Sequence, residues 1–112
     1  IQWSSQDVAT FLGTYLSEPK ADVVFEANKQ MKLATFREKI AKTGLCLDLK
    51  SQMLFFSNHF FINGEWADFY GTSAERLKTL ANHRSLDATS IEDDKLLQQL
   101  YDWYIVGYIN IR

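Results

Sequence analysis

The sequence is poor in the residues on which covalent sites and small secreted folds depend. Its 112 residues include one cysteine, Cys46, and one proline, Pro19. A lone cysteine excludes an internal disulfide, and its place between Leu45 and Leu47 indicates a buried or half-buried side chain rather than a nucleophile. The net charge is only −2, without a long run of one sign, so bulk charge favours neither nucleic acid nor an anionic membrane as a partner.

Long apolar runs are also missing. The longest lies near 54–56, far too short to span a bilayer, and no basic-then-apolar signal opens the chain. We therefore predict a soluble, cytoplasmic protein without a membrane partner. Apolar (46%) and aromatic (14%) side chains are plentiful, enough for one compact core. Because Ile1 is not an initiator and Trp3 has no preceding element to cover it, we expect that an upstream portion is missing.

Residues at helical spacing predict a first helix that begins at Ser4 or Ser5 and ends before Pro19. Residues 23–25 then predict a short strand or an extended connector, and the polar segment 27–32 suits a linker. We place a boundary here, with 1–28 as helix and connector and 29–112 as the main domain. The apolar face of the first helix consists of Val8, Phe11, Leu12, Tyr15 and Leu16.

Capping patterns and glycine stops predict three further helices. Capping boxes at 35–38 and 72–75 open the second and third, and a box at 89–92 or 90–93 opens the fourth. The second and fourth helices are expected to end at Gly44 and Gly107, and the predicted buried residues are Phe36, Ile40, Leu77, Leu80, Ala81, Leu96, Leu97, Leu100, Trp103 and Tyr104.

Alternation and turn signals predict the strands between these helices. Leu45, Leu47 and Leu49 alternate with polar or small residues, and apolar runs at 53–56 and 59–62 follow. The pair at 63–64, Asn-Gly, is a strong hairpin signal because both residues tolerate positive φ, and 108–111 closes the chain as a strand. The sequence therefore predicts an α+β fold: a winged-helix-like domain with a small antiparallel sheet, in an altered order of helix and wing.

Motifs for catalysis, metal binding and nucleotide binding do not occur. Neither His59 nor His83 has a carboxylate two residues later, and we expect them to be a strand-edge polar residue and a helix C-terminal residue. No serine lies in a GxSxG turn, and the five glycines suit turns and helix ends. The acidic run 92–94 complements a helix dipole. We therefore assign no catalytic, cofactor-binding or metal residue to this chain.

Two surfaces are candidates for partner contact. We do not expect the fourth helix to bind DNA, since its first turn is acidic and would meet phosphate. An anionic partner such as ribosomal RNA could contact the basic stretch, although a solvated helix face is the commoner explanation of such a stretch. Its residues are Lys29, Lys32, Arg37, Lys39 and Lys42. Aromatic residues at both ends of the chain exceed the needs of a small core, so some of them could face a partner. The candidate interface residues are Trp3, Val8, Phe11 and Tyr15. The equal alternative is that the first helix only covers the sheet.

Three segments in a fixed order carry a family resemblance. Residues 15–20 (YLSEPK) and 60–65 (FFINGE) are followed by 97–104 (LQQLYDWY), which runs into Gly107. From about Phe11 to Ile109, the chain resembles the C-terminal region of the JmjC-type cupin ribosomal oxygenases (cupin-4 family), with the bacterial ribosomal-protein arginine hydroxylases as the nearest match. The resemblance implies an iron-binding cupin barrel, a helical dimerisation region and a winged-helix-like domain, of which only the end is present here.

The resemblance also implies a function. The chain would be a non-catalytic accessory domain of an Fe(II)/2-oxoglutarate-dependent ribosomal-protein hydroxylase, supporting dimer geometry and protein-substrate docking. The parent would be a dioxygenase with Fe(II) and 2-oxoglutarate in the missing cupin domain, and the chain alone would not be an enzyme. Its partners would be that cupin domain, a second copy and a ribosomal protein. The alternative is a free-standing winged-helix module that binds protein or nucleic acid.

Overall fold

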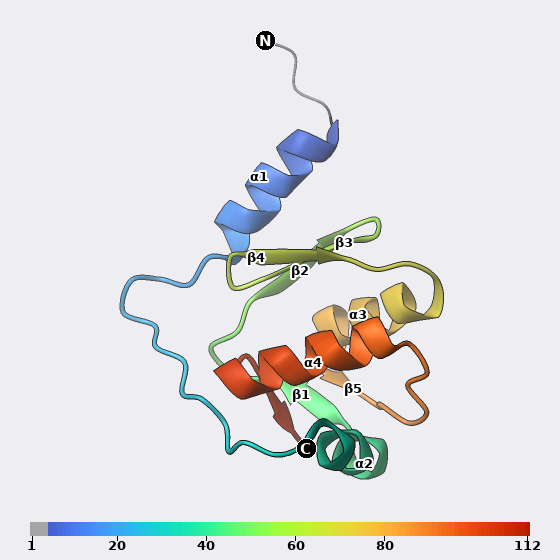
Figure 1. Ribbon diagram of the computed structural model, residues 1–112. Helices are drawn as coiled ribbons and strands as arrows, with labels where there is room; N and C mark the ends of the chain where they lie inside the picture. The colour runs from blue at the N-terminus through green and yellow to red at the C-terminus, as the bar shows by residue number, and fades with distance from the viewer. Residues whose placement is uncertain (1–4) are drawn as a thin grey trace.

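The computed structural model describes residues 5–112, so the predicted interface residue Trp3 lies outside the described part of the chain. Four helices and six strands occur within this range (Figure 1). The helices are α1 (Ser5–Ser17), α2 (Leu33–Thr43), α3 (Gly71–His83) and α4 (Asp94–Val106), and the strands are β1 (Leu45–Leu47), β2 (Met53–Phe56), β3 (His59–Ile62), β4 (Glu65–Asp68), β5 (Ser85–Leu86) and β6 (Ile109–Ile111). Over residues 5–112, each helix is too short or too polar to cross a membrane.

The strands form two antiparallel sheets rather than the single small sheet that we predicted. One has the order β5-β1-β6, and the other has the order β2-β3-β4. The second sheet is the predicted hairpin with one more strand, and its turn places Asn63 and Gly64 at φ 50° and 87°, as the Asn-Gly pair requires. The two-residue strand β5 was not predicted, because two residues are too few to show a period.

The core lies between the helices α2, α3 and α4 and the inner faces of both sheets (Figure 1). The buried residues predicted for α2 and α4 are confirmed, and Leu77 and Leu80 of α3 are fully buried, whereas Ala81 is half-buried. Trp103 and Tyr104 are also buried, so they serve the core and do not face a partner. Leu49 was wrongly predicted as a buried strand residue; it lies in the turn after β1 and is 95% exposed.

The predicted capping boxes are wrong in detail. α2 begins at Leu33 and α3 at Gly71, and neither has a side-chain cap on its first turn. Ser73 instead donates to Oδ2 of Asp93 at 2.6 Å, and Asp93 caps α4 by accepting from the backbone N of Lys95. This bond joins the starts of α3 and α4, a tertiary contact that a local pattern does not contain.

The connector between α1 and α2 is extended and is fastened to the end of α4. The side-chain amide of Asn28 donates to the carbonyls of Tyr104 and Ile109 and to Oδ1 of Asn110. A Cβ at Gly107, whose φ is 90°, would lie 2.1 Å from the carbonyl oxygen of Glu26. The segment that we predicted as a linker is therefore held against the domain by specific hydrogen bonds and by close backbone contact.

Candidate functional site

The first helix lies on the outer face of the β2-β3-β4 sheet and extends away from the body of the molecule (Figure 1). Its contact with the sheet is unusually close. A Cβ at Gly13 would lie 2.5 Å from the ring of Phe61, which is 1% exposed. At the end of the helix, the Ser17 hydroxyl accepts a hydrogen bond from the backbone N of Gly64 at 3.0 Å. Gly13 and Ser17 therefore form the face by which α1 is fixed to the hairpin.

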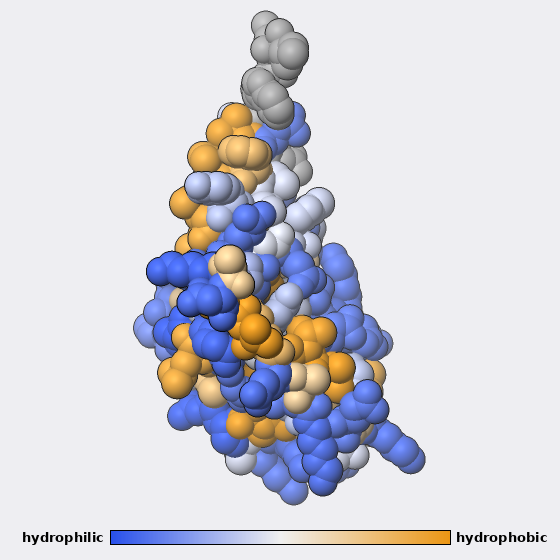
Figure 2. All heavy atoms as spheres, turned by 90° about the vertical axis from the view of Figure 1, so that its left-hand side faces the viewer, coloured by the Kyte–Doolittle hydropathy of each residue, from blue (hydrophilic) through white to orange (hydrophobic). Residues whose placement is uncertain are grey.

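The apolar stripe of α1 does not lie on the face that is fixed to the hairpin. That buried face is defined by positions 13 and 17, and the stripe occupies the other sides of the helix, at positions 8, 11, 12, 15 and 16. Phe11 is 66% exposed and Tyr15 is 64% exposed, and their rings are nearly parallel with centroids 6.4 Å apart. Hydrophobic residues gather over this part of the surface in Figure 2. The helix thus covers the sheet with its small residues and leaves its large apolar residues in solvent.

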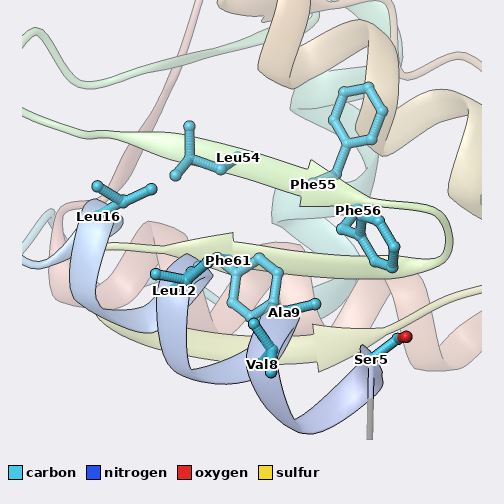
Figure 3. A pocket seen from close by; sticks show the side chains of 10 residues that line it. Ser5, Val8, Ala9, Leu12, Leu16, Leu54, Phe55, Phe56 and Phe61 are labelled. Atoms are coloured by element: carbon cyan, nitrogen blue, oxygen red, sulfur yellow. The ribbon is translucent and has the colours of Figure 1, made fainter.

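A groove of about 550 Å³ runs between α1 and the edge strand β2. Val8, Leu12 and Leu16 form its helical side, and Leu54 and Phe56 of β2 lie opposite (Figure 3). Ser5 is the one polar side chain in a lining that carries no charge. The size and composition of this groove suit an apolar surface better than a polar or charged ligand.

The structure brings together three of the four predicted interface residues. Val8, Phe11 and Tyr15 are all exposed on α1, and Trp3 lies outside the described residues. Sequence reasoning missed Leu54 and Phe56, which are 37% and 54% exposed. The run at 53–56 contains no polar residue, so both faces of β2 are apolar, and this was the signal available to find them.

The five basic residues do not form one face. Lys29 and Lys32 lie on the connector, while Arg37, Lys39 and Lys42 are exposed on α2. Arg37 turns toward the chain before α4 and donates to the carbonyl of Ile91 at 2.9 Å. Lys39 and Lys42 are three residues apart and share the opposite flank of α2. The ion pairs found in residues 5–112 involve none of these five side chains.

The described residues do not fit an iron site. His59 is on β3 and lies 2.6 Å from Oδ1 of Asp68, while His83 is the last residue of α3. Over residues 5–112, no group of three or more His, Cys, Asp or Glu side chains comes together in a way that could hold a metal ion. In the acidic run 92–94, Asp93 is engaged as the cap of α4. Its pKa is lowered, mainly because its carboxylate accepts a hydrogen bond from Ser73.

Comparison with known proteins decides the family. The model of the ROXA-like winged helix matches residues 1–110. The chain belongs to the ROXA-like winged-helix family. This membership confirms the predicted C-terminal region and the winged-helix fold. None of the curated proteins matches the chain.

Solved structures agree with the ROXA-like fold. An X-ray structure of ycfD from E. coli matches with a TM-score of 0.81 and 16% identity, over 97% of this chain and 30% of that one. A structure of E. coli YcfD, described as a ribosomal oxygenase in complex with cobalt and 2-oxoglutarate, matches with a TM-score of 0.80 and 16% identity, over 96% and 31%. This chain therefore spans about 30% of the length of the structures that it matches.

In this ROXA-like winged helix, α4 is built as a core helix. Leu96, Leu97 and Leu100 are buried against the domain. On its exposed side, Gln98 donates to Oδ1 of Asp102 at 2.8 Å. The exposed surface of α4 thus carries a locally paired carboxylate, whereas α1 carries large exposed apolar side chains.

Proposed function

We propose that this chain is the non-catalytic, C-terminal accessory domain of an Fe(II)- and 2-oxoglutarate-dependent ribosomal-protein hydroxylase. It acts by contact: it supports the geometry of a dimer and helps to form the surface that receives the protein substrate. The observation that carries the proposal is the exposed apolar stripe of α1, which is attached to the domain by the opposite face of the helix. A stripe of this kind is a partner surface, because a helix that only covered the sheet would turn Phe11 and Tyr15 inward.

The comparisons support the oxygenase part of this proposal. The chain belongs to the ROXA-like winged-helix family and has the fold of one end of E. coli YcfD, which is described as a ribosomal oxygenase and was solved with cobalt and 2-oxoglutarate. Iron would supply the oxidising chemistry from a separate cupin domain, and the residues described here contain no group suited to hold it. The domain's contribution to the reaction is to position the substrate.

The test uses the natural full-length protein that contains this chain. A Phe11→Gln, Tyr15→Gln variant is compared with the unaltered protein by sedimentation and by hydroxylation of ribosomal proteins in the presence of Fe(II) and 2-oxoglutarate. We expect the variant to dissociate into monomers or to lose activity toward protein substrate. Unchanged association and unchanged hydroxylation would contradict the proposal.

A second candidate function is contact with ribosomal RNA through the flank of α2 that carries Lys39 and Lys42. Their exposure and the lack of ion pairs to them in residues 5–112 favour it. Exchange of Lys39 and Lys42 for Gln should then weaken RNA binding and reduce its salt dependence. Exchange of Lys78, which is paired with Glu75 on α3, is the control.

A further inference from the structure

A separate pocket of about 460 Å³ lies between the C-terminal half of α4 and the connector that precedes α2. We call it the α4 pocket. Its volume is in the range of about 300 to 1,000 Å³ that is typical of ligand pockets. Its lining comes from α4 and the connector alone, so it is independent of α1 and of the groove beside it. The lining residues are Gln30, Tyr101, Asp102, Ile105 and Val106.

The connector wall of the α4 pocket is held in place on both sides of Gln30. Before it, the backbone N of Asn28 donates to the carbonyl of Ile105 at 3.2 Å. After it, the hydroxyl of Tyr101 donates to the carbonyl of Met31. A side chain that enters the pocket therefore meets a wall that is already positioned, and binding does not have to order the connector.

The charge in the α4 pocket is negative. Asp102 is the one charged residue of the lining, and its Oδ1 accepts from the Gln98 amide at 2.8 Å, which orients the carboxylate. Within residues 5–112, Oδ2 of Asp102 and the side-chain amide of Gln30 have no hydrogen-bond partner. The last turn of α4 contains no basic residue, so the helix itself does not offset the negative end of its dipole. These groups favour a cation.

The rest of the lining suits the stem of a long side chain. Val106 is 45% exposed, and Ile105 and Tyr101 are half-buried. Lysine and arginine side chains lay their methylene stems along apolar surface and keep the charged head at a polar group. A neutral apolar ligand, by contrast, would desolvate Asp102 without giving it a partner. The lining therefore fits a long basic side chain better than a small ion or an apolar ligand.

We propose that the α4 pocket binds a long basic side chain, lysine or arginine, of the protein substrate. The inference rests on the proposed function for the identity of this partner, and it gives the partner a contact that is separate from the α1 stripe. Proteins that bind RNA phosphates do so with Lys and Arg, so a ribosomal protein offers such side chains. The stem packs against Ile105 and Val106, and the charged head donates to Oδ2 of Asp102.

Two carboxylates of α4 form a matched pair for the test. Asp102 and Asp94 are both exposed on this helix, but only Asp102 lines the α4 pocket. In the natural full-length protein, fluorescence anisotropy measures the dissociation constants of labelled hexalysine and hexaarginine peptides for the unaltered protein, Asp102→Asn and Asp94→Asn. A Val106→Ser variant removes part of the apolar wall without a change of charge. Thermal unfolding verifies that each variant is folded.

We expect Asp102→Asn to raise the dissociation constant about three- to fivefold, which corresponds to the loss of one exposed ion pair. Val106→Ser should raise it about twofold through the lost apolar contact, and Asp94→Asn should leave it nearly unchanged. Equal effects of the two Asp exchanges would show a general attraction to negative charge and would overturn the inference. An effect of Asp102→Asn without any effect of Val106→Ser would show an ion pair outside the pocket, with the same consequence.

A second measurement connects the pocket to the substrate. For Asp102→Asn, the concentration of ribosomal proteins at half-maximal hydroxylation should rise about twofold or more, with the maximal rate unchanged. Weaker peptide binding without that rise would assign the pocket to another partner and overturn the inference, while the proposed function would stand. Absence of hydroxylation by the unaltered full-length protein would instead overturn the proposed function itself, so the two failures are distinguishable.

Discussion

The contact between Gly13 and Phe61 predicts that Gly13→Ala, normally a stabilising change within a helix, will destabilise this protein. The added Cβ would lie 2.5 Å from the Phe61 ring, so α1 must move away from the sheet. Alanine in place of glycine favours a helix by about 1 kcal/mol. Overpacking costs about 1 to 3 kcal/mol, and partial exposure of Phe61, now 1% exposed, forfeits a share of the about 1.5 to 3 kcal/mol that its burial provides. We expect a net loss of about 1 to 2 kcal/mol.

A double-mutant cycle separates the steric term from helix propensity. In a Phe61→Ala background, the space opposite Gly13 is open, and Gly13→Ala should stabilise by about 0.5 to 1 kcal/mol through propensity alone. The sign of the effect therefore reverses, and the coupling between the two positions is about 2 kcal/mol, within the range for residues in contact. Urea unfolding followed by circular dichroism measures all four free energies of unfolding.

Two results would refute this reasoning. If Gly13→Ala stabilises the otherwise unaltered chain, α1 does not lie on Phe61 as described. If the effect of Gly13→Ala is the same in both backgrounds, the loss of stability has another cause than the ring of Phe61. Either result would also remove the argument that α1 shows its apolar stripe to solvent, since that orientation depends on this contact.

Three further predictions concern the connector and the join between the sheets. Asn28→Ala removes three hydrogen bonds to the end of α4 and to β6 and should cost about 2 to 3 kcal/mol in urea unfolding; a loss below half of that would contradict the connector's role. Gly107 and Gly71 both have positive φ, but a Cβ at position 107 would clash with a backbone carbonyl, whereas a Cβ at position 71 would meet open space. Gly107→Ala should therefore destabilise the protein far more than Gly71→Ala, and equal losses of stability would contradict this. Burial, together with the 2.5 Å hydrogen bond to Glu65, raises the pKa of Tyr108 to about 12. Because this pKa exceeds the value of about 10 in the unfolded chain, the protonated Tyr108 stabilises the fold fully below pH 10, and this stabilisation is lost as pH rises through 12. The Tyr108→Phe variant should therefore lack that part of the alkaline decline in thermal stability. An identical decline in the variant and the unaltered protein would refute the assignment.

Much of the fold follows from local patterns. The helix periodicities, the stops at Gly44 and Gly107 and the Asn-Gly turn all appear in the structure, because each depends on residues within one or two turns of each other. The capping boxes fail for the opposite reason. Ser73 has a better partner in Asp93, twenty residues away, and sequence spacing does not reveal that pairing.

The candidate surface on α1 and β2 shows more clearly which features a sequence pattern does not contain. The apolar stripe of α1 was evident from spacing, but a stripe predicts burial without naming what buries it. The decisive residue is Gly13, which has no side chain and therefore no place in a hydrophobic pattern. Its close approach to Phe61 turns the stripe away from the sheet and forms the groove with β2. Only the three-dimensional arrangement joins Leu54 and Phe56 to the apolar stripe that begins at Val8 on α1.

The central claim is that this chain serves an oxygenase by contact and not by turnover. The most direct test measures 2-oxoglutarate decarboxylation, with Fe(II), ascorbate and a mixture of ribosomal proteins, for the natural full-length protein and for the 112-residue chain at equal concentration. The account predicts turnover by the full-length protein that depends on ribosomal protein, and none above a buffer control by the chain alone. Turnover by the chain itself, or none by the full-length protein, would contradict it.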